Sequence, residues 1–387
     1  MLKKVEPVGG VVRGLCDPRF LPVYEAFERN FREFGEIGAA VAVYWKGLPV
    51  VDLWGGYRDV ARELSWEADT MACMMSVAKG ISATAVAMVY DRGLVDLTEP
   101  VARYWPEFSQ AGKKRVTVAQ ALSHLAGVPV ADSAQEGDIY SFDVMAQAIA
   151  MQEPLWPPGT TQVYHSATLG HIAGMLVKRI TGKSMGRFIR EEISGPLGAE
   201  YQIGLIEDEE ARCATMIPSA NNLITAAKRS APDSLAYRAW KALPASEDFN
   251  THDWRAAEIP SVNGHGTARG VARIYAALSL GGTLDGVTLG KSSSFEMLRR
   301  EQKPTAYSPD SDVNDRVGIG YRLNSPPNRP MGPHMTSFGH SGAGGSQSFA
   351  DPEEQIGYCY CCNRMHDGRD IGKRAESLID ATYHSIG

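Results

Sequence analysis

Short runs of β-branched and aromatic residues near both ends of the chain predict strands. Five such runs cover residues 39–44, 50–54, 317–323, 346–350 and 356–362. The first two flank a turn-like Lys-Gly-Leu-Pro segment and therefore predict an antiparallel hairpin. A helical period of apolar residues over about 369–385 predicts a final helix after the last strand.

The middle of the chain has a different pattern, because its apolar positions recur at helical spacing. Three helices are predicted here, over about 76–92, 116–123 and 166–180. Residues 218–266 contain several prolines without a clear period, and they predict long loops over a site. Tyr237, Trp240 and Trp254 in this segment indicate an apolar pocket, although packing at the surface explains them nearly as well.

Strands at both ends and helices between them predict an α/β (α+β) fold, with an antiparallel sheet built from both termini and flanked by helices. We expect residues 1–65 and 270–387 to form this sheet domain, and residues 66–269 to form an inserted, mostly helical domain. The cleft between two such domains is where a small-molecule site is expected.

The composition changes this picture little. The chain has 387 residues and a net charge of -6, which argues against nucleic acid or an anionic membrane as a partner. The N-terminus begins with lysines but lacks the apolar run of a signal peptide, and no 18-residue uncharged apolar run occurs elsewhere. A cytoplasmic protein is therefore expected. The sequence does not determine its oligomeric state.

Six cysteines leave two interpretations open. Cys359, Cys361 and Cys362 crowd into one segment, but Cys-x-Cys-Cys is not a usual zinc spacing and no matching Cys/His pair follows. Buried free thiols in a core strand are the favoured interpretation. No metal and no cofactor are expected.

The sharpest chemical feature is Ser76-Val77-Ala78-Lys79. Side chains three residues apart on a helix lie on one face, so Lys79 can reach the hydroxyl of Ser76. A lysine in a dry pocket loses proton affinity and can take the proton that a serine must lose to become a nucleophile. The alternative is a helix-capping serine followed by a solvated lysine.

A second candidate is Tyr164, which lies between a Pro-Pro-Gly turn and the third predicted helix. A phenol beside a lysine cation has a lowered pKa and can share the role of general base. Taken alone, Tyr164 would be a core tyrosine with a satisfied hydroxyl. His124 and His165 are interpreted as structural hydrogen-bond partners, and His165 is expected nearer the site because it adjoins Tyr164.

A third candidate is the glycine-rich segment 338–346, which contains His340, Ser341, Gly342 and Ala343. Glycines permit close approach of the backbone to a ligand, and a backbone N–H group at such a place can stabilise an oxyanion. A plain turn between two strands explains the segment equally well.

Together these three segments resemble the serine β-lactamase-like superfamily, whose branches include AmpC-type β-lactamases, D-Ala-D-Ala peptidases and family VIII carboxylesterases. The family pattern is Ser-x-x-Lys, then Tyr-x-Asn, then Lys-Thr-Gly or a variant on an edge strand. Ser76 and Lys79 match the first element, and Tyr164 matches the start of the second. The resemblance extends over roughly residues 20–385 and includes segments 93–97, 121–129 and 264–268.

Two departures from the family pattern matter. Ser166 stands where asparagine is usual, and His340-Ser341-Gly342 stands where Lys-Thr-Gly is usual. A histidine is mostly neutral at pH 7 and cannot supply the permanent charge with which that lysine helps to bind a substrate carboxylate. The resemblance is therefore to the family VIII esterases, whose third motif is commonly His-x-Gly or Trp-x-Gly.

The resemblance implies a serine hydrolase that cleaves small carboxylic esters through an acyl-enzyme on Ser76. Lys79 and Tyr164 would act as one coupled general base and acid, and the N–H groups of Ser76 and Ala343 would form the oxyanion hole. His165 and Ser166 are expected beside Tyr164, and His340, Ser341 and Gly342 on the strand next to Ser76.

Several alternatives use the same machinery. They are a cytoplasmic amidase or D-peptidase, an acyltransferase, and a residual β-lactamase activity. From another class, the chain would be a catalytically silent binding protein, but the presence of Ser76, Lys79 and Tyr164 together argues against silence.

Overall fold

The computed structural model describes residues 3–5, 11–244, 249–305, 315–368 and 371–387. Its largest sheet is antiparallel, with strand order β1-β2-β4-β3-β13-β12-β11-β10. The strands are β1 (Lys3–Val5), β2 (Val12–Cys16), β3 (Gly38–Trp45), β4 (Leu48–Gly56), β10 (Arg322–Leu323), β11 (Phe338–Ser341), β12 (Gln347–Asp351) and β13 (Ile356–Cys362). Both ends of the chain thus build one sheet, as predicted.

The two ends meet where β3 pairs with β13, from Ile356 opposite Trp45 to Cys362 opposite Ala39. The predicted hairpin is confirmed as β3 and β4, with a register shift at Val43/Tyr44. The five strands predicted from the residue pattern omit β1, β2 and β11 of this sheet, but the family resemblance implied a strand at β11, which carries His340 and Ser341. Of the run 317–323, only the last two residues form a strand.

The chain bends before β10 because Gly320 has a left-handed φ of 84°. A β-carbon on Gly318 would lie 2.5 Å from the carbonyl oxygen of Leu298, so this stretch packs against another segment instead of pairing in the sheet.

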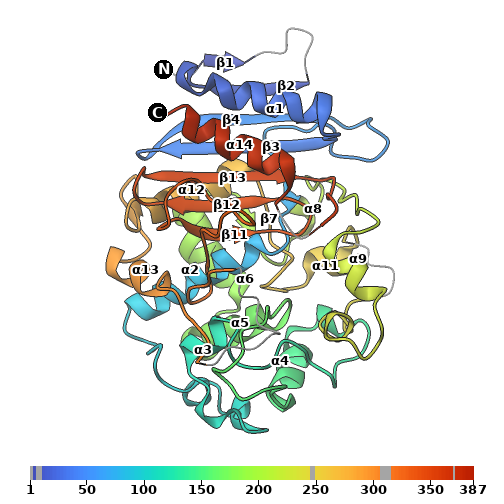
Figure 1. Cartoon of the computed structure of the whole chain (residues 1–387), viewed down its shortest axis with the longest axis vertical. Coiled ribbons are helices and arrows are strands. Elements are labelled where there is room, and N and C mark those ends of the chain that lie inside the picture. Colours follow the sequence, from blue (N-terminus) through green and yellow to red (C-terminus); the bar gives the residue numbers. More distant parts are fainter. Residues whose placement is uncertain (1–2, 6–10, 245–248, 306–314, 369–370) are drawn as a thin grey trace.

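Alternate residues of β3 enter two separate cores, as the two-residue period of a strand requires. Val41 and Val43 pack with α1 (Leu21–Glu33) and α14 (Gly372–His384), whereas Ala40 and Ala42 pack toward α12 (Ala268–Ser279). Figure 1 shows α1 and α14 in front of the sheet and α12 behind it. The predicted start of the final helix, Arg369, lies outside the described residues.

Small residues on the α12 side of the sheet allow that helix to approach closely. A β-carbon on Gly357 of β13 would lie only 2.2 Å from the backbone nitrogen of Ala276 in α12. The three clustered cysteines are buried free thiols on β13, as predicted, and the other three cysteines are also buried and free. Burial raises the pKa of the Cys362 thiol to about 11, so it is protonated at neutral pH.

The helical part lies below the sheet in Figure 1 and is built around α2 (Val77–Asp91). Every residue of α2 from Val77 to Val89 is buried, as expected of a helix that packs on all sides. The predicted helices 116–123 and 166–180 are observed as α3 (Val118–Leu122) and α5 (Thr168–Thr181), and α5 packs against α2.

Further helices and short strands complete the chain. The helices are α4 (Phe142–Met151), α6 (Met185–Phe188), α7 (Gly195–Leu197), α8 (Glu207–Glu210), α9 (Leu223–Lys228), α10 (Leu235–Arg238), α11 (His252–Ala256) and α13 (Ser292–Leu298). The small sheets are β5 (Ala72–Cys73), β7 (His265–Gly266) and β6 (Tyr201–Gln202), and β8 (Thr283–Leu284) with β9 (Val287–Thr288). The described residues of the segment 218–266 thus include three short helices, α9, α10 and α11, and not only loops. None of the helices in the described ranges has both the length and the hydrophobicity of a membrane span.

Candidate active site

Ser76 occupies the N-cap position of α2, but its hydroxyl makes no capping hydrogen bond to the helix. The residue before it, Met75, has a left-handed φ of 47°, which costs a non-glycine residue roughly 1–2 kcal/mol. The Met74 N–H donates to the carbonyl of Gly264 at 2.9 Å, and a β-carbon on Gly342 would lie 2.1 Å from the Met74 oxygen. This tight packing fixes the strained turn that presents Ser76 at the start of the helix.

Lys79 lies one turn further along α2 and is fully buried. Its Nζ lies 3.3 Å from Ser76 Oγ and donates to the backbone carbonyls of Ser166 at 2.7 Å and Ser261 at 3.0 Å. Burial lowers the pKa of Lys79, and the cation of Arg322 lowers it further. The lysine is therefore held against the serine in a state with weakened proton affinity.

Ser261 holds one of these carbonyls in place. Its Oγ donates to the carbonyl of Ala167 at 2.8 Å and accepts from the N–H of Gly170 at 2.7 Å, so it ties its loop to the first turn of α5. Ser82 of α2 also donates to the neighbouring carbonyl of Pro260 at 2.9 Å. No sequence pattern marks Ser261, because its contact with Lys79 is made by its backbone carbonyl.

The Tyr164 hydroxyl completes the group, since it hydrogen-bonds with the side chains of both Ser76 and Lys79. Burial works to raise the pKa of Tyr164, but the cations Lys79 and Arg322 outweigh burial and lower that pKa below its ordinary value. Lys79 Nζ lies 4.8 Å from the Tyr164 ring centroid. The structure thus brings the three predicted residues into one hydrogen-bonded cluster.

The loop after β11 approaches the same cluster. Gly342 packs against the turn before Ser76, and its N–H donates to the Ser346 carbonyl at 2.7 Å. Within the described chain, the N–H groups of Ser76 and Ala343 donate to no hydrogen-bond acceptor. Two such N–H groups at the edge of a cavity can both bind the oxygen of a reacting carbonyl.

A cavity of about 330 Å³ opens onto these groups, and Ser76, Tyr164, Ser166, Ser341 and Ala343 contribute to its wall. A second wall is mostly apolar and comes from α9, α10 and the residues that follow α10. Its members are Leu223, Ala227, Leu235, Ala236, Ala239 and Trp240.

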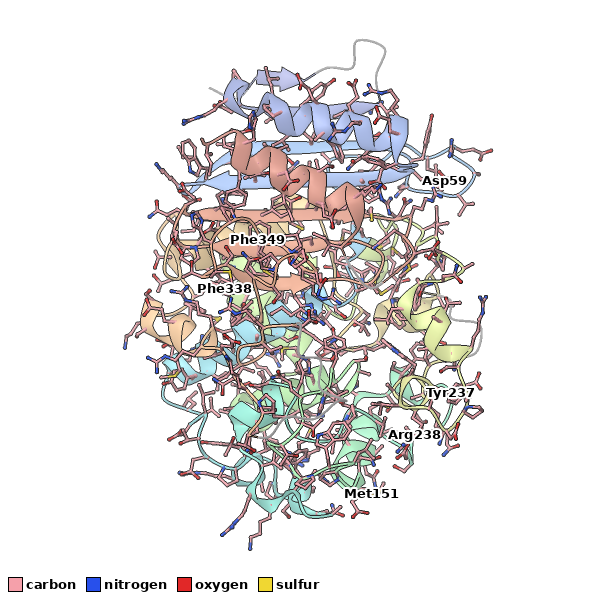
Figure 2. All side chains as sticks on the ribbon, viewed as in Figure 1. Asp59, Met151, Tyr237, Arg238, Phe338 and Phe349 are labelled. Carbon is pink, nitrogen blue, oxygen red and sulfur yellow. The ribbon has the colours of Figure 1, made fainter. Side chains whose placement is uncertain are left out.

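Of the three aromatics expected to form an apolar pocket, only Trp240 lines this cavity. Trp254 is buried against Phe249, with 4.9 Å between ring centroids. Tyr237 carries Lys228 over its ring and lies in the helical part near the edge of the view in Figure 2.

Two arginines of the cavity wall were missed by sequence reasoning. Arg322 of β10 lies with its Cζ 4.7 Å from the Tyr164 ring centroid, and Arg329 donates to Ser341 Oγ at 3.2 Å. Both form ion pairs with Asp315. His340 supplies no permanent charge here, as expected, and the two guanidinium groups bring positive charge to the site from other positions.

His340 lies on β11 next to Ser341, one strand in from the edge strand β10. Its side chain is buried, does not line the cavity, and bonds through Nδ1 to the Ser341 carbonyl at 2.7 Å. Burial, together with the nearby Arg322, holds the pKa of His340 well below its usual value, so the ring is neutral at pH 7. His340 thus supports the strand rather than facing a ligand.

Of the two histidines near Tyr164, His124 and not His165 contacts the tyrosine ring, whereas His165 was expected nearer the site. His165 is buried, with Nδ1 2.6 Å from the Val163 carbonyl and Nε2 accepting from the Val128 N–H at 3.2 Å. His124 instead packs on the Tyr164 ring at 4.8 Å between centroids. Side chains of adjacent residues point in different directions in an extended segment, so neighbouring Tyr164 in sequence did not bring His165 to the site.

The comparisons with known proteins agree with this geometry. The Beta-lactamase family model matches residues 27–382. The chain is 34% identical to "Esterase/beta-lactamase LipL" of Mycobacterium tuberculosis over 372 residues, which is 92% of this chain and 84% of that protein. Two solved structures also superpose closely.

One of these structures is a family VIII carboxylesterase, with a TM-score of 0.87 and 38% identity over 97% of this chain and 99% of the other. The second is a penicillin-binding protein homologue from Caulobacter crescentus, with a TM-score of 0.86 and 35% identity over the same shares of the two chains.

Proposed function

We propose that this chain, which belongs to the beta-lactamase family and is a serine hydrolase, cleaves carboxylic esters through an acyl-enzyme on Ser76. One observation carries the proposal. The Ser76 hydroxyl lies at the cavity wall, 3.3 Å from a fully buried lysine amine whose remaining N–H groups are held by two backbone carbonyls.

In the first step Ser76 Oγ attacks the ester carbonyl carbon, and its proton passes to the coupled pair of Lys79 and Tyr164. The carbonyl oxygen becomes an oxyanion that accepts hydrogen bonds from the N–H groups of Ser76 and Ala343. When the C–O bond to the alcohol breaks, Tyr164 returns the proton to the leaving oxygen. Water then attacks the acyl-enzyme by the same route and releases the acid and free Ser76.

The apolar wall from α9 and α10 supports an ester substrate, because it offers the acyl or alcohol part of an ester a surface without hydrogen-bond requirements. Two relatives named as an esterase and a carboxylesterase support the same choice. A cytoplasmic amidase or D-peptidase and an acyltransferase remain alternatives on the same residues. The division into a sheet domain and an inserted helical domain also remains a proposal.

The test is hydrolysis of p-nitrophenyl acetate and butyrate, followed by intact-mass measurement of an acyl adduct. Ser76→Ala should abolish both turnover and adduct, while Ser279→Ala, which removes a buried hydroxyl of α12 that does not line the cavity, should retain both. Equal hydrolysis by Ser76→Ala and the parent protein would overturn the proposal. p-Nitroanilides and added alcohols distinguish the amidase and acyltransferase alternatives.

A further inference from the structure

We propose that Arg322 and Arg329 form a carboxylate-binding subsite in the cavity, so that the preferred esters carry a negative charge. This inference rests on the proposed ester hydrolysis and names the class of substrate that the site selects.

Arg322 is unusually placed for an arginine, because it is only 6% exposed and still lines the cavity. Its Nη1 pairs with Asp315, but its buried Nε has no hydrogen-bond partner within the described parts of the chain. A buried guanidinium N–H without an acceptor costs free energy, and an anionic ligand group would supply the missing acceptor.

Arg329 reaches the same region from the loop between β10 and β11. Its Nε lies 3.1 Å from Asp315 Oδ1, and its Nη1 donates to Ser341 Oγ at 3.2 Å. Ser341 immediately precedes the segment that carries the Ala343 N–H. The two guanidinium groups therefore border the place where the ester carbonyl would bind.

The charged side chains described at this wall are one carboxylate and two guanidinium groups. Asp315 is the one carboxylate among the described residues that line the cavity, and it faces two guanidinium groups. Among the described residues, the wall therefore has an excess of one positive charge even when Lys79 is neutral. Positive charge in a mostly desolvated cleft attracts an anion more strongly than the same charge would in water.

A simpler role for Arg322 is to lower the pKa of Tyr164, whose ring it contacts. That role would affect neutral and anionic esters equally, because Tyr164 would serve both. A carboxylate subsite would instead change the preference between two esters that differ only in charge. The experiment therefore measures a ratio of two substrates on each protein.

We would measure kcat/KM at fixed ionic strength for two matched pairs. Mono-p-nitrophenyl glutarate and p-nitrophenyl methyl glutarate place the charge on the acyl side. 4-Acetoxybenzoate and 4-acetoxybenzamide place it on the alcohol side. We expect the parent protein to prefer the anionic ester of one pair by about tenfold, mainly through KM, as one charge-assisted contact implies.

Arg329→Gln should lower that anionic-to-neutral ratio by about tenfold, and Arg329→Lys should retain part of it. The matched control is Arg316→Gln, because Arg316 is also half-buried and pairs with Glu301 but does not line the cavity. Partial loss of folded protein lowers both rates together and leaves the ratio unchanged.

Hydrolysis of the neutral esters with no anionic preference in either pair would overturn the subsite and leave the proposed function intact. An equal fall of both rates in Arg329→Gln would overturn it as well. Failure of the parent protein to hydrolyse any of the four esters would instead contradict the proposed function.

Discussion

Two buried lysines of this protein, Lys79 and Lys113, look alike until their partners are compared. Each is fully buried, and burial lowers the pKa of each, to about 8 for Lys113. Each Nζ donates to backbone carbonyls. The two lysines differ in the remaining hydrogen-bond partners of Nζ, which are hydroxyls for Lys79 and a third carbonyl for Lys113.

Lys113 donates to the carbonyls of Gln110, Ala150 and Gln152. Three acceptors require three N–H groups, and only the protonated ammonium has them. Since its pKa is about 8, Lys113 is mostly charged at pH 7. It is thus a structural cross-link between the segment around residue 113 and the end of α4.

Lys79 donates to only two carbonyls, and its remaining side faces the hydroxyls of Ser76 and Tyr164. A neutral amine has two N–H groups and one lone pair, so this arrangement fits the neutral form as well as the ammonium. A hydroxyl can also donate a proton, which a carbonyl cannot. A lowered lysine pKa therefore does not identify a catalytic base, whereas the kind of neighbouring acceptor does.

The largest expected effect is on Lys79. Lys79→Met should lower kcat/KM for p-nitrophenyl butyrate by about 10³–10⁴-fold, because the general base is lost. Lys113→Met should leave kcat per folded molecule within about twofold, as measured by active-site titration. Equal loss of kcat in both variants would show that the comparison of their partners is wrong.

The proposed oxyanion N–H groups of Ser76 and Ala343 lie in the same site as Lys79, so their loss should also lower activity. Ala343→Pro removes one N–H and should lower kcat by about 10²–10³-fold, the usual effect of losing one oxyanion donor. Ala343→Gly is the matched control, because it keeps the N–H and should retain most of the activity. A proline variant as active as the glycine variant would remove Ala343 from the mechanism.

The free energy of unfolding should differ less between the Lys79→Met and Lys113→Met variants than their activities do. Lys113→Met leaves three carbonyls without their donor, and we expect a loss of about 3 kcal/mol in the free energy of unfolding. Lys79→Met leaves two carbonyls without a donor and should cost less. Urea unfolding followed by far-UV circular dichroism measures both values, and a stability loss confined to Lys79→Met would contradict the cross-link.

The smallest effect is expected in the pH profile. Only a deprotonated base accepts the serine proton, so kcat/KM should rise with pH and level off above the apparent pKa of the coupled Lys79 and Tyr164 pair. The cation of Arg322 lowers the pKa of both groups. Arg322→Gln should therefore move the rising limb to higher pH by about one unit, and Lys113→Met should leave it in place. A limb that does not move in Arg322→Gln would contradict this coupling.

The sequence alone determined the features that depend on local spacing. The three-residue separation of Ser76 and Lys79 on a helix places both side chains on one face wherever that helix packs. The period of the terminal strands likewise predicted a sheet built from both ends. The resemblance then added Tyr164, which local spacing could not connect to Ser76.

Only the tertiary structure decided the surroundings that give these residues their chemistry. The carbonyls of Ser166 and Ser261 that hold Lys79 are backbone atoms, which every residue carries, so no sequence pattern marks them. Arg322 and Arg329 reach the cavity because β10 and its loop lie beside the third motif, and they supply the charge that His340 does not. Side-chain identity fixes which chemistry is available, but contacts between distant segments decide which atoms share a dry cavity and which remain structural.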